Sequence, residues 1–172
     1  RIPSAAELTR LRDAFLYDPT TGAITWARPN RPIQKSLWRE IGDPVGFAQL
    51  GYWCMYFEGQ NYRSHRLAWF LHTGHWPFPT EEVDHIDGDR LNNEFGNLRI
   101  ASRSQNQSNK GPQANSKTGV KGVSWHASNR RWRASIGKDN KIICLGHFDS
   151  IEDAARAYAD AARAIHGEFA SL

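Results

Sequence analysis

Val83-Asp84-His85-Ile86-Asp87-Gly88-Asp89 is the stretch of sequence around which the rest of the chain is organised. Apolar residues flank an Asp-His pair in this stretch and predict the end of a strand. The residues that follow are rich in Asp, Asn and Gly, which rarely hold regular structure, so they predict a loop. Leu98 and Ile100 then alternate with Arg99 in the pattern of a half-buried second strand.

A short helix is predicted directly after this second strand. Ser102 is followed three residues later by Gln105, a capping-box pattern that marks a helix start and places Asn106 in the second turn. The order strand, loop, strand, short helix is expected to bring Asp84, His85 and Asn106 to one place.

These three side chains suit one kind of chemistry. The carboxylate of Asp84 and the amide oxygen of Asn106 are hard ligands of the type that Mg²⁺ and Mn²⁺ prefer. His85 lies beside them and can accept a proton from water near neutral pH. A divalent ion and a base on one small scaffold are what phosphodiester hydrolysis requires. We therefore expect one Mg²⁺ or Mn²⁺ ion per active site, held by Asp84 and Asn106.

The segment resembles the ββα-metal motif of HNH nucleases, in the form found in phage and intron homing endonucleases. Asn97 and Asn106 lie 12 and 21 residues after His85, within flanking Val-Asp-His-Ile-Asp-Gly, as in that motif. The third position is often histidine in the family. Asparagine is a competent oxygen ligand, so an active "HNN" variant is expected. We expect His85 to act as the general base and Asn97 to act indirectly, by tying the loop to the strand.

The composition excludes several classes of protein. The chain has 172 residues, a net charge of +4 and two cysteines, which are too few for a disulfide framework and fit a reducing cytosol. No apolar run is long enough to cross a membrane, and no signal peptide is recognised. His72 and His75 form His-x-x-His without further nearby ligands, so no structural zinc is expected. The resemblance implies a phage- or intron-encoded protein in the cytoplasm of a bacterial host.

Charge is distributed unevenly along the chain. Residues 110–149 hold eight Lys and Arg against two Asp, a local charge of +6. Residues 81–109 hold three Arg against six Asp and Glu, a local charge of −3. Composition alone leaves two interpretations open, namely a polyanion-binding surface beside a metal site or a solvated basic face.

The first 80 residues are expected to frame the motif, which is too small to fold alone. An amphipathic helix is predicted from Ser4 to Asp18, because Leu8, Leu11, Phe15 and Leu16 recur at helical spacing. Further along, the patterns predict strands at 23–26, 45–47, 52–57 and 62–64, and a helix at 65–71 that ends before Gly74. This leader is also similar to the N-terminal part of phage HNH endonucleases.

The last third of the chain predicts three antiparallel strands and one helix. The strands are expected at 120–126, 131–136 and 142–148. Ser150 with Asp153 three residues later predicts a helix over 151–166, ended by Gly167. Alternation places Val123, Trp125, Trp132, Ala134 and Ile136 on the inward face of the sheet.

This unit resembles the Apetala2/ERF DNA-binding domain through Gly122-Val123-Ser124-Trp125, Arg131 to Ile136, Leu145-Gly146-His147-Phe148 and the start of the helix. In that family the outer face of the sheet lies in the DNA major groove. Ile142 and Cys144 depart from the plant members, which carry arginine and tryptophan there. The predicted DNA-binding residues are Lys110 and Lys117 in a basic arm, Lys121, and on the sheet Ser124, His126, Arg131, Arg133 and Ser135.

The sequence therefore predicts an α+β protein in two parts. Residues 1–109 form a nuclease domain with a ββα-metal core at about 81–109, residues 110–118 a basic linker, and residues 119–172 a three-stranded antiparallel sheet packed on one helix. The predicted function is a site-specific, divalent-metal-dependent endonuclease of the homing type that nicks double-stranded DNA as a monomer. Two alternatives stay open: a DNA-binding regulator with a decayed nuclease module, and a non-specific, toxin-like nuclease.

Overall fold

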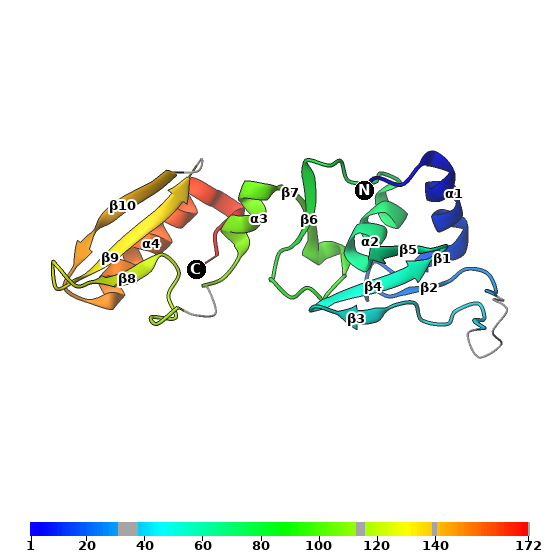
Figure 1. Ribbon diagram of the computed structural model, residues 1–172, viewed down its shortest axis with the longest axis horizontal. Helices are drawn as coiled ribbons and strands as arrows, with labels where there is room; N and C mark the ends of the chain where they lie inside the picture. Colours follow the sequence, from blue (N-terminus) through cyan, green and yellow to red (C-terminus); the bar gives the residue numbers. More distant parts are fainter. Residues whose placement is uncertain (31–37, 113–115, 139–140, 172) are drawn as a thin grey trace. The chain divides into compact units, whose positions relative to one another are not determined.

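The chain folds into two compact units, Arg1–Ser102 and Arg103–Leu172 (Figure 1). This computed structural model describes residues 1–30, 38–112, 116–138 and 141–171. The fold class is α+β, as predicted. The contacts divide the chain between Ser102 and Arg103, seven residues before the boundary expected from the sequence. Residues 113–115 of the predicted linker lie outside the described residues.

The described residues of the first unit form two α-helices and three small antiparallel sheets, β1-β2, β3-β4-β5 and β6-β7. Its elements in order are α1 Ala5–Ala14, β1 Phe15–Tyr17, β2 Ile24–Trp26, β3 Phe47–Gln49, β4 Tyr52–Phe57, β5 Gln60–Arg63, α2 Ser64–Thr73, β6 Glu81–His85, the 3-10 helix η2 Phe95–Asn97, and β7 Leu98–Ser102.

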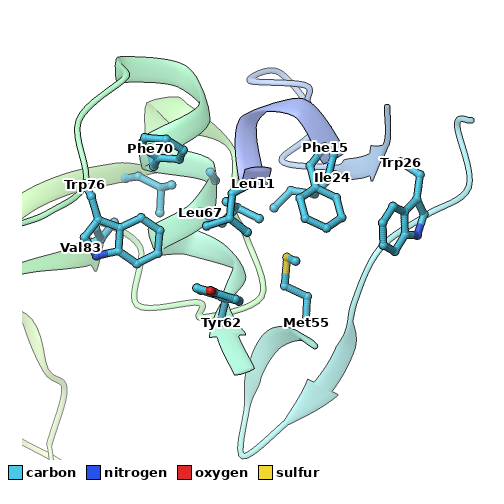
Figure 2. Packing of buried hydrophobic residues seen from close by; sticks show 13 residues of the cluster. Leu11, Phe15, Ile24, Trp26, Met55, Tyr62, Leu67, Phe70, Trp76 and Val83 are labelled. Atoms are coloured by element: carbon cyan, nitrogen blue, oxygen red, sulfur yellow. The ribbon is translucent and has the colours of Figure 1, made fainter. Parts of the chain in front are cut away.

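One hydrophobic core joins these elements. Figure 2 shows Leu11 of α1 and Leu67 of α2 meeting Met55 of β4, and all three side chains are almost completely buried. Val83 of β6 and Leu98 of β7 belong to the same cluster. Burying an aliphatic side chain of this size contributes about 1.5–3 kcal/mol. The leader therefore anchors the two strands of the ββα motif through packing, as expected.

The prediction for the first helix was wrong at its C-terminal end. α1 ends at Ala14, and Phe15–Tyr17 forms β1, paired antiparallel with β2. Leu16 therefore points outward and is 57% exposed instead of facing the core. The helical spacing of the apolar residues continued past Ala14, but the pairing of β1 with β2 decides the backbone conformation there.

The hairpin and the helix predicted after it are confirmed. β4 and β5 are joined at Glu58 and Gly59, both with positive φ (47° and 80°), as a two-residue antiparallel connection of the primed type requires. α2 follows directly and ends at Gly74, whose φ of 77° lets its N–H donate to the carbonyl of Phe70.

The ββα order is also confirmed in sequence. β6 is followed by a loop, η2 and β7, and α3 (Arg103–Asn109) begins where the capping pattern predicted. α3 belongs to the second unit by its contacts.

The second unit is a three-stranded antiparallel sheet of order β10-β9-β8, packed on one helix (Figure 1). Its elements after α3 are β8 Val123–His126, β9 Arg131–Lys138, β10 Lys141–Phe148, α4 Ile151–His166 and the 3-10 helix η3 Gly167–Phe169. The predicted helix 151–166 has the observed bounds. Val123, Ala134 and Ile136 of the sheet are buried in one cluster with Ala154 and Tyr158 of α4.

One inward residue of this sheet departs from the expectation. Trp125 is 52% exposed, although strand alternation places it on the same face as Val123. Its ring lies edge-on against the ring of Trp132, at a centroid distance of 5.1 Å, and Trp132 reaches the core. The two tryptophans therefore lie at the edge of the core, and only Trp132 packs into it.

Helix α4 offers a test of the predicted cap. The Ser150 hydroxyl accepts a hydrogen bond from the Asp153 N–H at 3.0 Å. We expect Ser150→Ala to destabilise the second unit by about 1 kcal/mol, since the helix loses this partner. Hydrogen exchange of the slowest amides of α4 and β9 should accelerate about fivefold. Ser128→Ala, in an exposed turn, is the control, and equal rates in both variants would contradict the capping role.

No helix among the described residues is long and apolar enough to span a membrane.

Candidate active site and DNA-binding surface

Asp84 and His85 are neighbours at the C-terminal end of β6. In the antiparallel register Asp84 lies opposite Arg99 of β7, and His85 lies opposite Leu98. Successive side chains of a strand point to opposite faces, so the two residues lie on different sides of this ribbon. Both side chains are buried, with 6% and 5% of their residue surface exposed.

The Asp84 carboxylate is compensated by Arg99. The Arg99 Nε donates to Oδ2 of Asp84 at 3.1 Å, and the guanidinium Nη2 lies 3.0 Å from the same oxygen. A buried carboxylate without a cation would cost several kcal/mol. The opposed positions on β6 and β7 therefore supply the charge that allows this carboxylate to stay buried.

His85 is held in a defined orientation. Its Nε2 lies 3.2 Å from Oδ1 of Asn93, which favours the tautomer with the proton on Nε2 and the lone pair on Nδ1. The ring also packs edge-to-face against His65, at a centroid distance of 5.0 Å. Burial lowers the pKa of His85, although the Asn93 hydrogen bond and the charge of Asp87 partly oppose this shift. The lowered pKa favours the neutral imidazole, which is the form that can accept a proton.

A second histidine and two arginines surround this ring. The pKa of His65 lies well below its ordinary value, mainly because the ring is buried and also because of the charge of the neighbouring His85. Tyr52 lies next to His65, with ring centroids 5.4 Å apart. The guanidinium carbons of Arg63 and Arg90 lie 4.1 and 4.9 Å from the Tyr52 ring centroid. These cations could contact a phosphate near His85. They were not predicted, because β4, β5 and the loop after β6 bring them together from separate parts of the sequence.

Asn97 joins the loop to the strand. Its Nδ2 donates to Oδ1 of Asp87 and to the carbonyl of Asn92, both at 2.9 Å, and its Oδ1 accepts from the Asp87 N–H at 3.0 Å. Its carbonyl accepts from the N–H of Ile86. This is the tie that was expected of Asn97, while its effect on cleavage stays a prediction.

Asn93 is the residue of this loop that the sequence analysis missed. Its side chain is buried against His85, and its backbone is held by the N-terminal hairpin, since Tyr17 Oη donates to the Asn93 carbonyl at 2.7 Å. Gly22 has a φ of 72°, and a Cβ there would lie 2.5 Å from the Asn93 carbonyl carbon. The leader thus fixes the loop at the point where it orients the histidine.

The donor set suits a hard divalent ion by its chemistry. Asp84 offers a carboxylate and Asn106 an amide oxygen, the ligands that Mg²⁺ and Mn²⁺ accept. Asn106 lies on α3, and its role as a metal ligand stays a prediction. Within the described residues, no three His, Cys, Asp or Glu side chains cluster in a way that could hold a metal.

Comparison with known proteins agrees with this motif. Residues 62–108 match the HNH endonuclease family, a span that includes β6, β7 and most of α3. Protein 3.8 of Escherichia phage T7 is 36% identical over 110 residues, which are 63% of this chain and 88% of that protein. The chain belongs to the HNH endonuclease family. An uncharacterized HNH endonuclease of Acanthamoeba polyphaga mimivirus is 37% identical over 89 residues, which cover 52% of this chain and 45% of that protein.

The second unit of this HNH endonuclease matches the AP2 domain over residues 118–168. Its fold, three antiparallel strands packed on α4, is the one expected for that domain. An AP2 domain implies DNA binding. No solved structure matches the chain significantly.

The outer face of the AP2 sheet carries the predicted DNA-binding residues. The register pairs Ser124 with Arg133 and His126 with Arg131, while Ser135 lies opposite Cys144. Their neighbours Ala134 and Ile136 are buried against α4, so by alternation Arg133 and Ser135 face away from the helix.

A polar cluster at the centre of this face includes one residue that was not predicted. His147 of β10 lies opposite Arg133, because a register shift after Cys144 turns it outward. Its ring is 5.0 Å from the ring of His126. Nδ1 of His126, Nε of Arg133 and Nε2 of His147 are buried and have no hydrogen-bond partner within the described part of the chain. Buried polar atoms without a partner are uncommon in folded proteins, which sets this cluster apart from the rest of the sheet.

The other predicted basic residues fall into two groups. Lys110 and Lys117 are exposed. Arg131 pairs with Asp149 at 2.9 Å, and Lys121 is half-buried with its ammonium on backbone carbonyls. The DNA-binding role of all four stays a prediction.

The His-x-x-His pair of the leader packs on aromatic rings. The ring of His72 lies 3.8 Å from that of Phe95, and the ring of His75 lies 4.7 Å from that of Phe78. His75 also approaches Glu81 at 3.9 Å.

Asn93 supplies a testable link between the loop and the base. We expect Asn93→Leu to slow DNA cleavage about tenfold, because the His85 ring loses the acceptor on Nε2, and the loss of one buried hydrogen bond costs about 1–3 kcal/mol. Single-turnover cleavage of plasmid DNA measures this. Asn93→Asp keeps an acceptor oxygen and should retain more activity. Cleavage by Asn93→Leu at the wild-type rate would show that Asn93 has no part in orienting the base.

Proposed function

We propose that the chain is a site-specific, divalent-metal-dependent DNA endonuclease of the homing type, which cuts one strand of double-stranded DNA as a monomer. The observation that carries this proposal is the buried His85 ring, oriented by Asn93 at 3.2 Å and adjacent on β6 to Asp84. A base and a hard ligand that are both built into the motif argue for a working site. The second unit, with its AP2 fold, would recognise the target site on the DNA.

The chemistry follows from the orientation of His85. Because Nε2 carries the proton toward Asn93, Nδ1 is the atom that would take a proton from the attacking water. The water oxygen bonds to phosphorus as the bond to the 3′ oxygen breaks, and the leaving 3′ oxygen takes a proton from solvent. The products are a 5′ phosphate and a 3′ hydroxyl. Asn97 would keep the loop in place during this step through its bonds to Asp87 and Asn92.

The divalent ion would be held by Asp84 and Asn106. When bound, it supplies positive charge that stabilises the phosphate in the transition state. Arg63 and Arg90, stacked on Tyr52 beside the histidines, would add positive charge on the protein side. Mg²⁺ and Mn²⁺ both suit this donor set, and a metal titration of the cleavage rate compares them.

Plasmid cleavage tests the proposal directly. Wild-type protein should cut supercoiled plasmid carrying its target site with Mg²⁺ or Mn²⁺ and should not cut in EDTA. Absence of cutting on target DNA by wild type, together with tight specific binding, would favour a regulator with a decayed nuclease module. Cutting without any preferred site would favour a non-specific, toxin-like nuclease. A phage relative fits action in the cytoplasm of a bacterial host, which stays a prediction.

The number of strands cut is a separate expected result. One motif copy per chain predicts that a monomer first converts supercoiled plasmid to the nicked, open-circular form. Linear DNA should appear later and only as a product of second events. Agarose gels of a time course at limiting protein measure both forms. Linear product at the earliest times, with no nicked intermediate, would show concerted cutting of both strands and so a second active site.

A further inference from the structure

Helix α3 belongs to the ββα motif by its sequence and to the second unit by its contacts. It forms the last element of the ββα motif and is covered by the match to the HNH endonuclease family, which extends to residue 108. Its contacts nevertheless place it with the second unit, where it packs against η3 at the C-terminal end of the AP2 domain. The helix that carries the proposed metal ligand Asn106 is therefore supported by the domain that is expected to bind DNA.

Lys121 makes the strongest of these contacts. Its Nζ donates to the carbonyl of Ser108 at 2.6 Å and also to the carbonyl of Lys110. The last carbonyls of a helix have no partner within the helix and carry the negative end of its dipole. An ammonium group there therefore donates a hydrogen bond to a carbonyl and is also attracted by the dipole. The N–H of Ser171 also donates to the Ser108 carbonyl, at 3.3 Å.

A second contact fixes the same turn of the helix. The hydroxyl of Ser108 lies 3.3 Å from Nδ1 of His166, the last residue of α4. Ser108 is thus bound through both its carbonyl and its side chain. It lies two residues after Asn106, within the same turn of α3.

α3 needs this support to be a helix. It has seven residues and no buried side chain. Isolated helices shorter than about 12–15 residues are marginal in water, so helices of this length depend on tertiary contacts. Lys121, His166 and Ser171 supply such contacts within the second unit.

We propose that Lys121 is a positioning residue for the metal site, which holds α3 in helical form against the AP2 domain and so presents Asn106 as a ligand. This inference rests on the proposed function, because it requires Asn106 to bind the metal. It also changes the expected role of Lys121. Lys121 was expected to bind DNA, whereas the structure places its ammonium on two carbonyls of the chain. Burial lowers the pKa of Lys121, in keeping with an inward-facing amine.

The test compares Lys121→Met with Lys141→Met in the full chain. Lys141 is exposed, lies in the same basic segment 110–149 and is not among the predicted DNA-binding residues. Hydrogen exchange of residues 103–109 in metal-free protein should be at least fivefold faster in Lys121→Met and unchanged in Lys141→Met. The Mn²⁺ concentration that gives half-maximal cleavage should rise severalfold only in Lys121→Met, and Lys121→Arg should restore most of both values.

DNA binding separates this role from a phosphate contact. Lys121→Met should leave the salt dependence of the dissociation constant unchanged, whereas loss of a phosphate contact would reduce the slope by about 1. Unchanged exchange of 103–109, or a reduced slope, in Lys121→Met would overturn the inference. If wild type fails to cut under any metal, the proposed function fails, while the exchange data still decide whether Lys121 holds α3.

A second variant guards against general unfolding. Amides of β9 report on the AP2 domain itself and should stay protected in Lys121→Met. If they do not, Ser108→Ala decides, because it leaves Lys121 in place and removes only the Ser108 hydroxyl, which lies near Nδ1 of His166 and donates to the Ser104 carbonyl within α3. Faster exchange of 103–109 with β9 still protected supports the inference, and unchanged exchange of 103–109 in that variant overturns it.

Discussion

His85→Ala is expected to reduce DNA cleavage by a factor of about 10²–10⁴, the usual contribution of a positioned general base. The substitution removes Nδ1, the proposed proton acceptor, and leaves the Asp84–Arg99 pair and the loop bonds of Asn97 in place. Single-turnover cleavage of target plasmid at saturating Mg²⁺ or Mn²⁺ measures the loss.

DNA binding should survive this substitution almost unchanged. Residues 81–109 carry a net charge of −3, while residues 110–149 carry +6, so most of the attraction to DNA comes from the second unit. The dissociation constant of His85→Ala for target DNA, measured without metal, should lie within about twofold of wild type, a change of less than about 0.5 kcal/mol. His75→Ala, in the leader and packed on Phe78, is the matched control and should cut normally. Equal loss of binding and cutting in His85→Ala would refute this division of labour.

The candidate catalytic and metal-binding residues of the motif could be proposed from the sequence because they lie close together in it. Asp84 and His85 are adjacent, and Asn97 lies within a short loop that must close between two paired strands. The structure places Asn97 where it ties that loop, as expected. Asn93 could not be chosen in the same way, since the loop holds several Asn and Asp residues and only its path decides which one meets His85.

The residues that were missed are those brought together by tertiary contacts. Arg63 and Arg90 meet on Tyr52 through three different elements, and no spacing rule connects them. His147 is turned outward by a register shift in β10 that a regular alternation does not predict. The end of α1 was misplaced for a related reason, because pairing with β2 outweighs the local helical pattern at Phe15.

The AP2 domain shows that the alternation of side chains along a strand predicts the face on which a residue lies but not its burial. It places Arg133 and Ser135 on the face away from α4, and the buried Ala134 and Ile136 agree. It does not tell how deeply a residue near the strand end is covered, which is why Trp125 was expected to be more buried than it is. The alternation of the strand backbone decides on which face of the sheet a side chain lies. How deeply that side chain is buried depends on how far α4 extends over it.

Arg133→Ala is expected to weaken binding to target DNA by about 1–3 kcal/mol, roughly 5- to 150-fold, and to reduce the preference for the target site. Arg133 is at the centre of the outer sheet face, opposite Ser124 on one side and His147 on the other. Its Nε is buried and has no hydrogen-bond partner among the residues that the structure describes. Arg131 differs, since Asp149 already pairs with it. Its central place on the face makes Arg133 the arginine that we choose to test for a base contact.

Two further variants separate base recognition from general attraction. Arg133→Lys keeps the charge but loses the planar fork that pairs with guanine, so it should retain non-specific binding and lose site preference. Arg156→Ala removes one positive charge from α4, on the other side of the sheet, and should change target preference little. Competition binding with target and scrambled DNA measures the preference, and cleavage at saturating protein should stay near wild type in all three variants. If Arg133→Lys keeps full site preference while Arg133→Ala loses only affinity, Arg133 binds a phosphate and another residue of the face recognises the bases.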